Sequence, residues 1–556
     1  MRGLGLTACL AALGLAAAGP AWAQEEEHPL PPPVPVADDA LSEALETGEL
    51  TEAEYALERA RSIFQLERAR REFGDVARPA AHDATLILRD LAARVGELTG
   101  SERAVARTIL ARPDDGGVEI GNGWNAPESL SSPACSAVCV HWVDESGNDD
   151  APSDADVDPA NGIPDWVDLT LLSLDNVWFQ EISTLGYRAP LSDLASPNDG
   201  GNKLLDVYLD DLGAFGVFGY CTSDDPDVAD AWAVSAYCVI DNDFSPDQYG
   251  HGHTPQEFLE VTSAHEFHHA SQFAYDSGED YWLMEGTAAN IEETVYPAID
   301  DNVGFLRFWS PLSRPSSPLD RGGFGNSEYG SWIFWRFLQE KIGGDPDIVR
   351  EIWERADALD PSPADGDEPA DDYSLKAARR ELEERGLGFP GVFARFATAN
   401  RLLDYADAEA ANYPSTPVAK RFVIGVQAPV TRWQSWKIDH LAARFFSFKP
   451  GKQVPVDARL RVTTRLPKTV ARATLIVVDA DGSTSTRQLQ RNARGFAHGG
   501  VRFGHGEVKR VDLVLSNGSP RMVACWKHQG PPSYSCFGRP LDDGRVFELR
   551  GRLVSS

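Results

Sequence analysis

Residues 254–296, TPQEFLEVTSAHEFHHASQFAYDSGEDYWLMEGTAANIEETVY, carry the pattern that most constrains the fold of this chain. His265-Glu266-Phe267-His268-His269 matches the spacing H-E-x-x-H. On a helix, residues i and i+4 lie on one face, so His265 and His269 can bind the same metal ion. Glu266 lies between them in sequence, where its carboxylate can reach a metal-bound water. The motif therefore predicts a metal centre built on one helix.

Local signals predict a helix across this motif. Thr254, Pro255 and Glu257 match an N-cap, a first helical residue and a capping-box partner. Ser277-Gly278 is a typical stop. A second helix is expected to begin at Tyr281. The motif then lies in the middle of a long helix, where both sides hold it rigidly.

The third metal ligand is expected to come from the second helix. A catalytic zinc site has three protein ligands and one open position for water. Glu285 is the first choice for this ligand, with Glu292 and Glu293 as alternatives. His268 lies on a different face of the helix, so we expect it to pack or to support the site.

H-E-x-x-H followed by W-L-x-E-G-x-A resembles the gluzincin zinc metallopeptidases. More narrowly, HEFHHASQFAYD with WLMEGTAANIEETVYP resembles a bacterial family of exported metalloproteases. The resemblance implies an α+β zincin-like domain with His265, His269 and Glu285 as zinc ligands and Glu266 as general base. Gluzincins often use a Tyr or His to stabilise the oxyanion, and Tyr329 is our candidate for that donor. The gap between His269 and Glu285 is shorter than in the best-known gluzincins, so the connecting loop must be tighter.

The first residues, MRGLGLTACLAALGLAAAGPAWA, have the basic start, apolar run and A-x-A end of a signal peptide. We expect residues 1–23 to be cleaved and the protein to be exported. A lipoprotein signal at Cys9 is the alternative. No other stretch is long and apolar enough to span a membrane.

Six cysteines follow the predicted signal peptide, and they fall in pairs that are close in sequence. An oxidising compartment favours disulfides between such pairs, although sequence alone leaves the connectivity open. The pairs are Cys135 with Cys139, Cys221 with Cys238, and Cys525 with Cys536.

The net charge of the chain is −34, which argues against a nucleic-acid partner because phosphate binding needs a basic surface. We expect the protein to be a monomer.

Residues 24–117 are expected to form a helical propeptide, with helices near 51–73 and 84–98 and a processing linker at 112–117. A permanent N-terminal domain is the alternative. This region has no cysteine, so any inhibition of the zinc site must be steric. Residues 118–413 are expected to be the metalloprotease domain, in which strands near 203–210 and 232–240 are candidates for the edge strand that aligns the substrate.

An acidic loop near the start of that domain predicts a Ca²⁺ site. Closely spaced Asp and Asn around a glycine turn supply the oxygen ligands that calcium prefers. The alternation is interrupted between Asp158 and Asn161, and a solvated loop capping the next helix is the alternative. The candidate ligands are Asp154, Asp156, Asp158, Asn161 and Asp165.

Residues 414–556 change to short alternating runs with Asp-Gly and Asn-Gly turn signals, which predicts an antiparallel β-sandwich. Together these patterns predict a secreted zinc endopeptidase that acts on protein or peptide substrates. The alternative from another class is a secreted adhesin or binding protein on an inactive protease scaffold.

Overall fold

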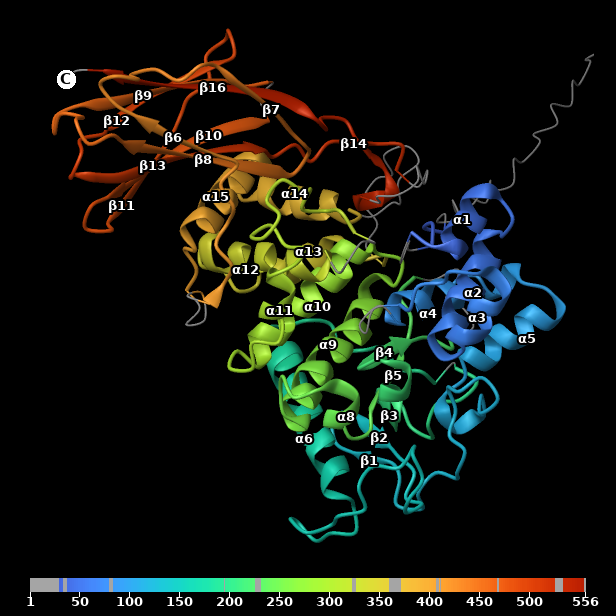
Figure 1. The fold of residues 1–556 in the computed structure, drawn as a ribbon. Helices are drawn as coiled ribbons and strands as arrows, with labels where there is room; N and C mark the ends of the chain where they lie inside the picture. Colours follow the sequence, from blue (N-terminus) through green and yellow to red (C-terminus); the bar gives the residue numbers. More distant parts are fainter. Residues whose placement is uncertain are drawn as a thin grey trace, which may run out of the picture.

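The computed structural model describes residues 30–33, 38–79, 84–194, 196–225, 232–322, 327–359, 372–406, 410, 412–467, 470–525 and 534–554. Helices and a small sheet form the body of the molecule, and three further sheets lie in its C-terminal part (Figure 1). This arrangement confirms the α+β class. The predicted signal peptide lies outside the described residues.

Five helices form the N-terminal region: α1 (Ala40–Thr47), α2 (Glu52–Phe64), α3 (Leu66–Phe73), α4 (Ala84–Ala92) and α5 (Gly100–Ile109). The prediction of one helix over 51–73 was wrong, because the chain leaves helical geometry at Gln65, where φ is −128°. α4 is also shorter than predicted and is followed by a 3₁₀ turn, Val95–Glu97. Apolar side chains of α2, α4 and α5 belong to the same hydrophobic core as the central sheet and helices.

The central sheet has five strands: β1 (Ala134–Cys135), β2 (Cys139–His141), β3 (Asp206–Asp210), β4 (Gly219–Thr222) and β5 (Tyr237–Asp241). Their order is β1-β2-β3-β5-β4, so β3 and β5 lie inside the sheet and β4 forms an edge. The prediction that strands near 203–210 and 232–240 supply the edge was therefore wrong. β4 was missed because all four of its residues are buried, and such a run shows no alternation.

Helices α6 (Asp165–Trp178) and α9 (Pro255–Asp276) pack beside this sheet, and α10 (Tyr281–Val295) packs on α9. α9 begins with the predicted capping box between Thr254 and Glu257. Further helices complete the central region: α8 (Pro246–Tyr249), α11 (Val303–Leu306), α12 (Trp332–Lys341), α13 (Ile348–Arg355), α14 (Leu375–Glu384) and α15 (Phe389–Leu402). Gly286 lets α10 approach α12 closely, since a Cβ there would lie 2.6 Å from Trp335 Nε1.

Two sheets at the C-terminal end enclose a separate core. One has the order β11-β10-β13-β8-β6 and the other β12-β9-β16-β7, while β14 and β15 form a separate two-stranded sheet. The pairs are antiparallel except β6 with β8, which is parallel and was not predicted. The bounds are β6 (Lys420–Ile424), β7 (Gln434–Ile438), β8 (Ala442–Pro450), β9 (Arg459–Arg465), β10 (Ala471–Asp479), β11 (Thr484–Gln488), β12 (Phe496–Arg502), β13 (Val508–Asn517), β14 (Met522–Val523), β15 (Arg539–Pro540) and β16 (Arg545–Val554).

All three predicted disulfides are present: Cys135–Cys139, Cys221–Cys238 and Cys525–Cys536. They are compatible with an extracellular protein, because such bonds persist in oxidising compartments. Among the described residues, no helix combines the length and apolar character required to cross a bilayer.

Candidate metal centre

Helices α9 and α10 bring His265, His269 and Glu285 together in the interior. Their ligand atoms all lie within 4.8 Å of one another. Glu285 Oε2 is 3.2 Å from His265 Nε2 and 3.6 Å from His269 Nε2. All three side chains are buried. The structure therefore groups the two histidines and the glutamate that the sequence put first.

The other nitrogen of each imidazole is held by a separate partner. His265 Nδ1 is 2.6 Å from Glu292 Oε1, and His269 Nδ1 is 2.7 Å from Gln272 Oε1. The Gln272 amide nitrogen donates to Met284 O and Thr287 Oγ1, so its oxygen faces His269 and accepts the Nδ1 proton. This fixes the tautomer of His269, with the lone pair of Nε2 directed toward Glu285. Such support is typical of metal-ligating histidines.

The buried polar atoms in this group fit a divalent cation. Among the described residues, neither His269 Nε2 nor Glu285 Oε1 has a hydrogen-bond partner. A lone pair facing a carboxylate in a buried site is unfavourable unless a positive charge lies between them. Two imidazole nitrogens and one carboxylate oxygen are the donor set of a catalytic zinc site. The residues present therefore fit zinc.

Glu266 lies beside this group and touches two other parts of the chain. Its Oε2 accepts a 3.0 Å hydrogen bond from Thr85 Oγ1 of α4. Thr85 Oγ1 also accepts a 3.0 Å bond from the backbone N–H of Cys221 on the edge strand β4. Gly219 allows β4 to lie this close, since a Cβ there would be 2.8 Å from Glu266 Cγ. The N-terminal region thus covers the carboxylate that the sequence assigned as general base.

Burial and charge shift the pKa values of the two carboxyls in opposite directions. Burial raises the pKa of Glu266, although the neighbouring imidazoles oppose the shift. Burial also acts to raise the pKa of Glu285, but its contacts with the imidazoles of His269 and His265 lower it to about 2. Glu285 is therefore an anion, as a ligand must be, while Glu266 is the better proton acceptor of the two.

Tyr329 and His268 are also buried near the histidines. The Tyr329 ring is stacked 6.1 Å from the ring of His265, which keeps it a candidate oxyanion donor. His268 Nδ1 instead pairs with Glu181 at 2.8 Å, away from the three-residue group. His268 is therefore buried outside the three-residue group, and a supporting role for it stays a prediction.

The alternatives for the third ligand occupy other positions. Glu292 contacts the nitrogen of His265 that faces away from Glu285. Glu293 is buried but is not in the group. Sequence reasoning did not identify Gln272, although its position three residues after His269 on α9 places it on a neighbouring part of the same face. Nothing local in the sequence marks Thr85, which acts 181 residues away.

In the acidic loop at 154–165, carboxylates bind backbone N–H groups of the loop. Asp156 accepts from Asn161 and Gly162, and Asp165 accepts from Val157 and Asp158. These bonds join parts of the loop that are five to eight residues apart in sequence. Calcium binding by Asp154, Asp156, Asp158, Asn161 and Asp165 stays a prediction.

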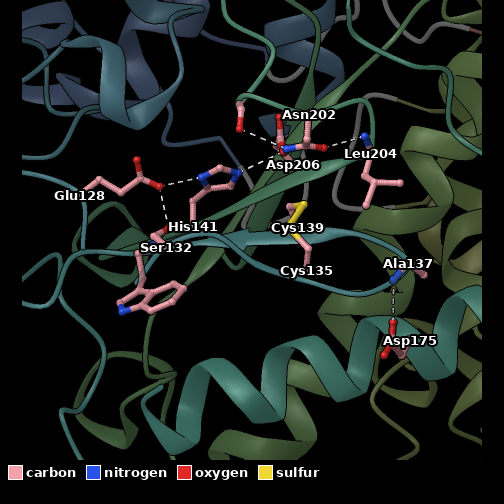
Figure 2. Close-up of a disulfide and its surroundings, with 12 residues drawn as sticks. Glu128, Ser132, Cys135, Ala137, Cys139, His141, Asp175, Asn202, Leu204 and Asp206 are labelled. Atoms are coloured by element: carbon pink, nitrogen blue, oxygen red, sulfur yellow. Dashed lines mark hydrogen bonds and ion pairs between the residues drawn. A yellow bond between two sulfur atoms is a disulfide. The ribbon is translucent and has the colours of Figure 1, made fainter. Parts of the chain in front are cut away.

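The predicted processing linker begins with a buried side chain. Arg112 has no exposed surface and forms ion pairs of 2.6 Å with Asp193, 2.6 Å with Asp206 and 3.0 Å with Asp224. Asp206 also pairs with His141, whose other nitrogen contacts Glu128 (Figure 2). Arg112 therefore connects the N-terminal region to the sheet, and a processing linker at 112–117 stays a prediction.

No protein-family model matches the chain, and no curated protein matches it. The resemblance to gluzincins therefore rests on the quoted motifs and on the geometry of the three-residue group.

Proposed function

We propose that the protein is an exported zinc-dependent endopeptidase. The observation that carries the proposal is the buried convergence of His265, His269 and Glu285, with two polar atoms that lack partners among the described residues. Zinc bound there would lower the pKa of a water to about 7 and polarise the scissile carbonyl.

The chain's own residues supply the proton transfers and the alignment. Glu266 accepts the proton of the attacking water and then delivers it to the leaving amine nitrogen. Tyr329 donates a hydrogen bond to the oxyanion. Once α4 has left it, the edge of β4 pairs with the backbone of an extended peptide, with Cys221 N–H as one donor.

In the form described here the N-terminal region occupies these positions. The hydroxyl of Thr85 donates a hydrogen bond to the carboxylate of Glu266 and accepts one from the backbone N–H of Cys221. We infer that residues 24–117 act as an inhibitory propeptide and that activation requires α4 to leave β4. This inhibition is steric, as the absence of cysteine in the region requires.

Metal analysis and one substitution test the proposal. Purified protein should contain about one zinc per chain. Glu266→Gln should keep the metal and abolish both cleavage of an unfolded protein and maturation of the chain. Glu260→Gln, on the solvent side of the same helix, is the matched control and should change neither. Zinc content well below one per chain, or full cleavage by Glu266→Gln, would contradict the proposal and favour the adhesin alternative.

A further inference from the structure

The C-terminal sheets differ sharply in charge from the rest of the chain. Residues 414–556 contain 24 Lys and Arg against nine Asp and Glu, whereas residues 1–413 contain 27 against 76. The overall charge of −34 therefore hides a basic unit attached to a strongly acidic one. Such a charge asymmetry affects which charged partners the protein attracts and which part of the protein they meet.

Seven basic side chains and one acidic side chain lie on the outward side of the β12-β9-β16-β7 sheet. Strand alternation directs the apolar residues of β9, Leu460 and Val462, into the core. We call the charged outward side chains the basic face. They are Lys437, Arg459, Arg461, Arg465, Arg502, Arg550 and Arg552, with Glu548 as the acidic member.

The register places like charges directly opposite one another. Arg459 pairs across strands with Arg502, and Arg461 pairs with Arg552. Such like-charge pairs destabilise a sheet. Asp479 pairs with Arg502 at 2.8 Å and offsets part of the repulsion at the first pair. Among the described residues, neither Arg461 nor Arg552 forms an ion pair, so no carboxylate of this part of the chain relieves the repulsion at the second pair. An external anion would relieve it.

Apolar side chains border the basic face on its β7 side. Val430 is bridged to Arg552, Trp433 lies under the guanidinium of Arg550, and Val546 is opposite Lys437. Their side chains are 43 %, 41 % and 50 % exposed. Arginines beside exposed Val and Trp form the combination that suits the interface of a lipid bilayer, where anionic headgroups meet hydrocarbon.

The basic face lies on the side of the sandwich away from α15 and the central helices (Figure 1). The opposite sheet packs on α15 through β10 and β13. Contact through the basic face therefore leaves the central region free. Repulsion between an anionic surface and the acidic residues 1–413 would favour the same orientation.

We propose that the basic face docks the protein on an anionic lipid surface. Guanidinium groups bind the phosphates of the headgroups, and Val430, Trp433 and Val546 enter the interface. The sheet presents these groups as a broad, regular array, whereas a protein that binds a single strand of nucleic acid usually has a groove that follows the strand. The aromatic ring of Trp433 is covered by Arg550, so it does not offer the free stacking platform that single-stranded nucleic acid uses. This proposal does not depend on the metal centre.

Co-sedimentation of the full chain with lipid vesicles tests the proposal. Protein should pellet with vesicles of phosphatidylcholine plus phosphatidylglycerol, should stay in solution with phosphatidylcholine alone, and should be released by salt. Arg461→Glu with Arg552→Glu should weaken binding about a hundredfold or more, because each basic side chain near the surface contributes substantially. Arg421→Glu with Lys449→Glu makes the same charge change on the opposite sheet and should bind within about threefold of wild type.

Thermal unfolding of each variant shows whether the fold is retained. Failure of the wild-type chain to pellet with anionic vesicles overturns the proposal. Equal binding by the Arg461→Glu, Arg552→Glu variant also overturns it. Retention on heparin or single-stranded DNA without vesicle binding would show that the face recognises a soluble polyanion, and the lipid proposal would then be wrong.

Discussion

Thr85 Oγ1 of α4 donates a 3.0 Å hydrogen bond to Glu266 Oε2 of α9, joining residues 181 positions apart in a fully buried contact. The same hydroxyl accepts from the edge strand β4. One residue of the N-terminal region thus bonds to both the proposed general base and the proposed donor to the substrate backbone. We therefore expect access to the metal centre to depend on how firmly α4 is held.

Arg89 is the side chain that holds α4 most directly. It is buried and donates to Ser277 O at 3.2 Å and Glu279 O at 2.6 Å, in the turn between α9 and α10. Arg89→Ala should loosen α4 and increase peptide hydrolysis by the unprocessed chain several-fold, as well as proteolytic cleavage near α4. Arg107→Ala, exposed on α5, is the control and should leave both rates unchanged. Lower hydrolysis by a folded Arg89→Ala protein would contradict the covering role of α4.

Glu292 should control metal affinity without being a ligand. Its carboxylate fixes His265 by a 2.6 Å contact at Nδ1. Loss of such a partner typically lowers metal affinity 10- to 100-fold. Glu292→Gln should therefore weaken zinc in a chelator competition by about that factor, whereas Glu285→Gln should remove stable binding. A reversed ranking would indicate that Glu292 is the third ligand.

The boundaries of α9 and α10 were predictable because their caps are local. The capping box at Thr254 and the Asp280 side chain that accepts from Leu283 N both lie within three residues of the helix start. Once these two helices are placed, His265 and His269 lie on one face of α9 and Glu285 lies in α10, which makes it the candidate third ligand. This much of the candidate site needed only short-range information.

The features that sequence reasoning missed depend either on contacts between residues far apart in sequence or on a charge difference that the net charge of the whole chain conceals. β4 is defined by its pairing with β5, and Thr85 reaches Glu266 only after both helices are packed. The basic face was hidden because net charge was summed over a chain whose two ends differ in sign. Counting charge by predicted domain would have revealed it.

Arg112 should be a major contributor to stability. Its guanidinium is buried among three carboxylates and lies 5.1 Å from the Tyr237 ring. Arg112→Ala leaves those carboxylates uncompensated and should lower the free energy of unfolding by about 3–5 kcal/mol. Arg112→Lys keeps the positive charge but not the forked geometry of the guanidinium. Its free energy of unfolding should therefore lie between those of wild type and Arg112→Ala. Arg70→Ala, which breaks an exposed pair with Glu67, should cost at most about 1 kcal/mol in the same denaturant titration.

His141 should make stability depend on pH on the alkaline side of neutrality. Burial alone would lower its pKa, but hydrogen bonds with Asp206 and Glu128 and their charges raise it to about 9. Because the folded-state pKa lies above the usual 6.5, the charged form stabilises the fold. That contribution is complete below about pH 6.5, is lost as pH rises through about 9, and is at most about 3 kcal/mol. Urea unfolding at several pH values should show a decline over this interval for wild type. His141→Gln should be less stable at pH 6 and should show a flatter profile. Parallel profiles for the two proteins would exclude His141 as the group responsible.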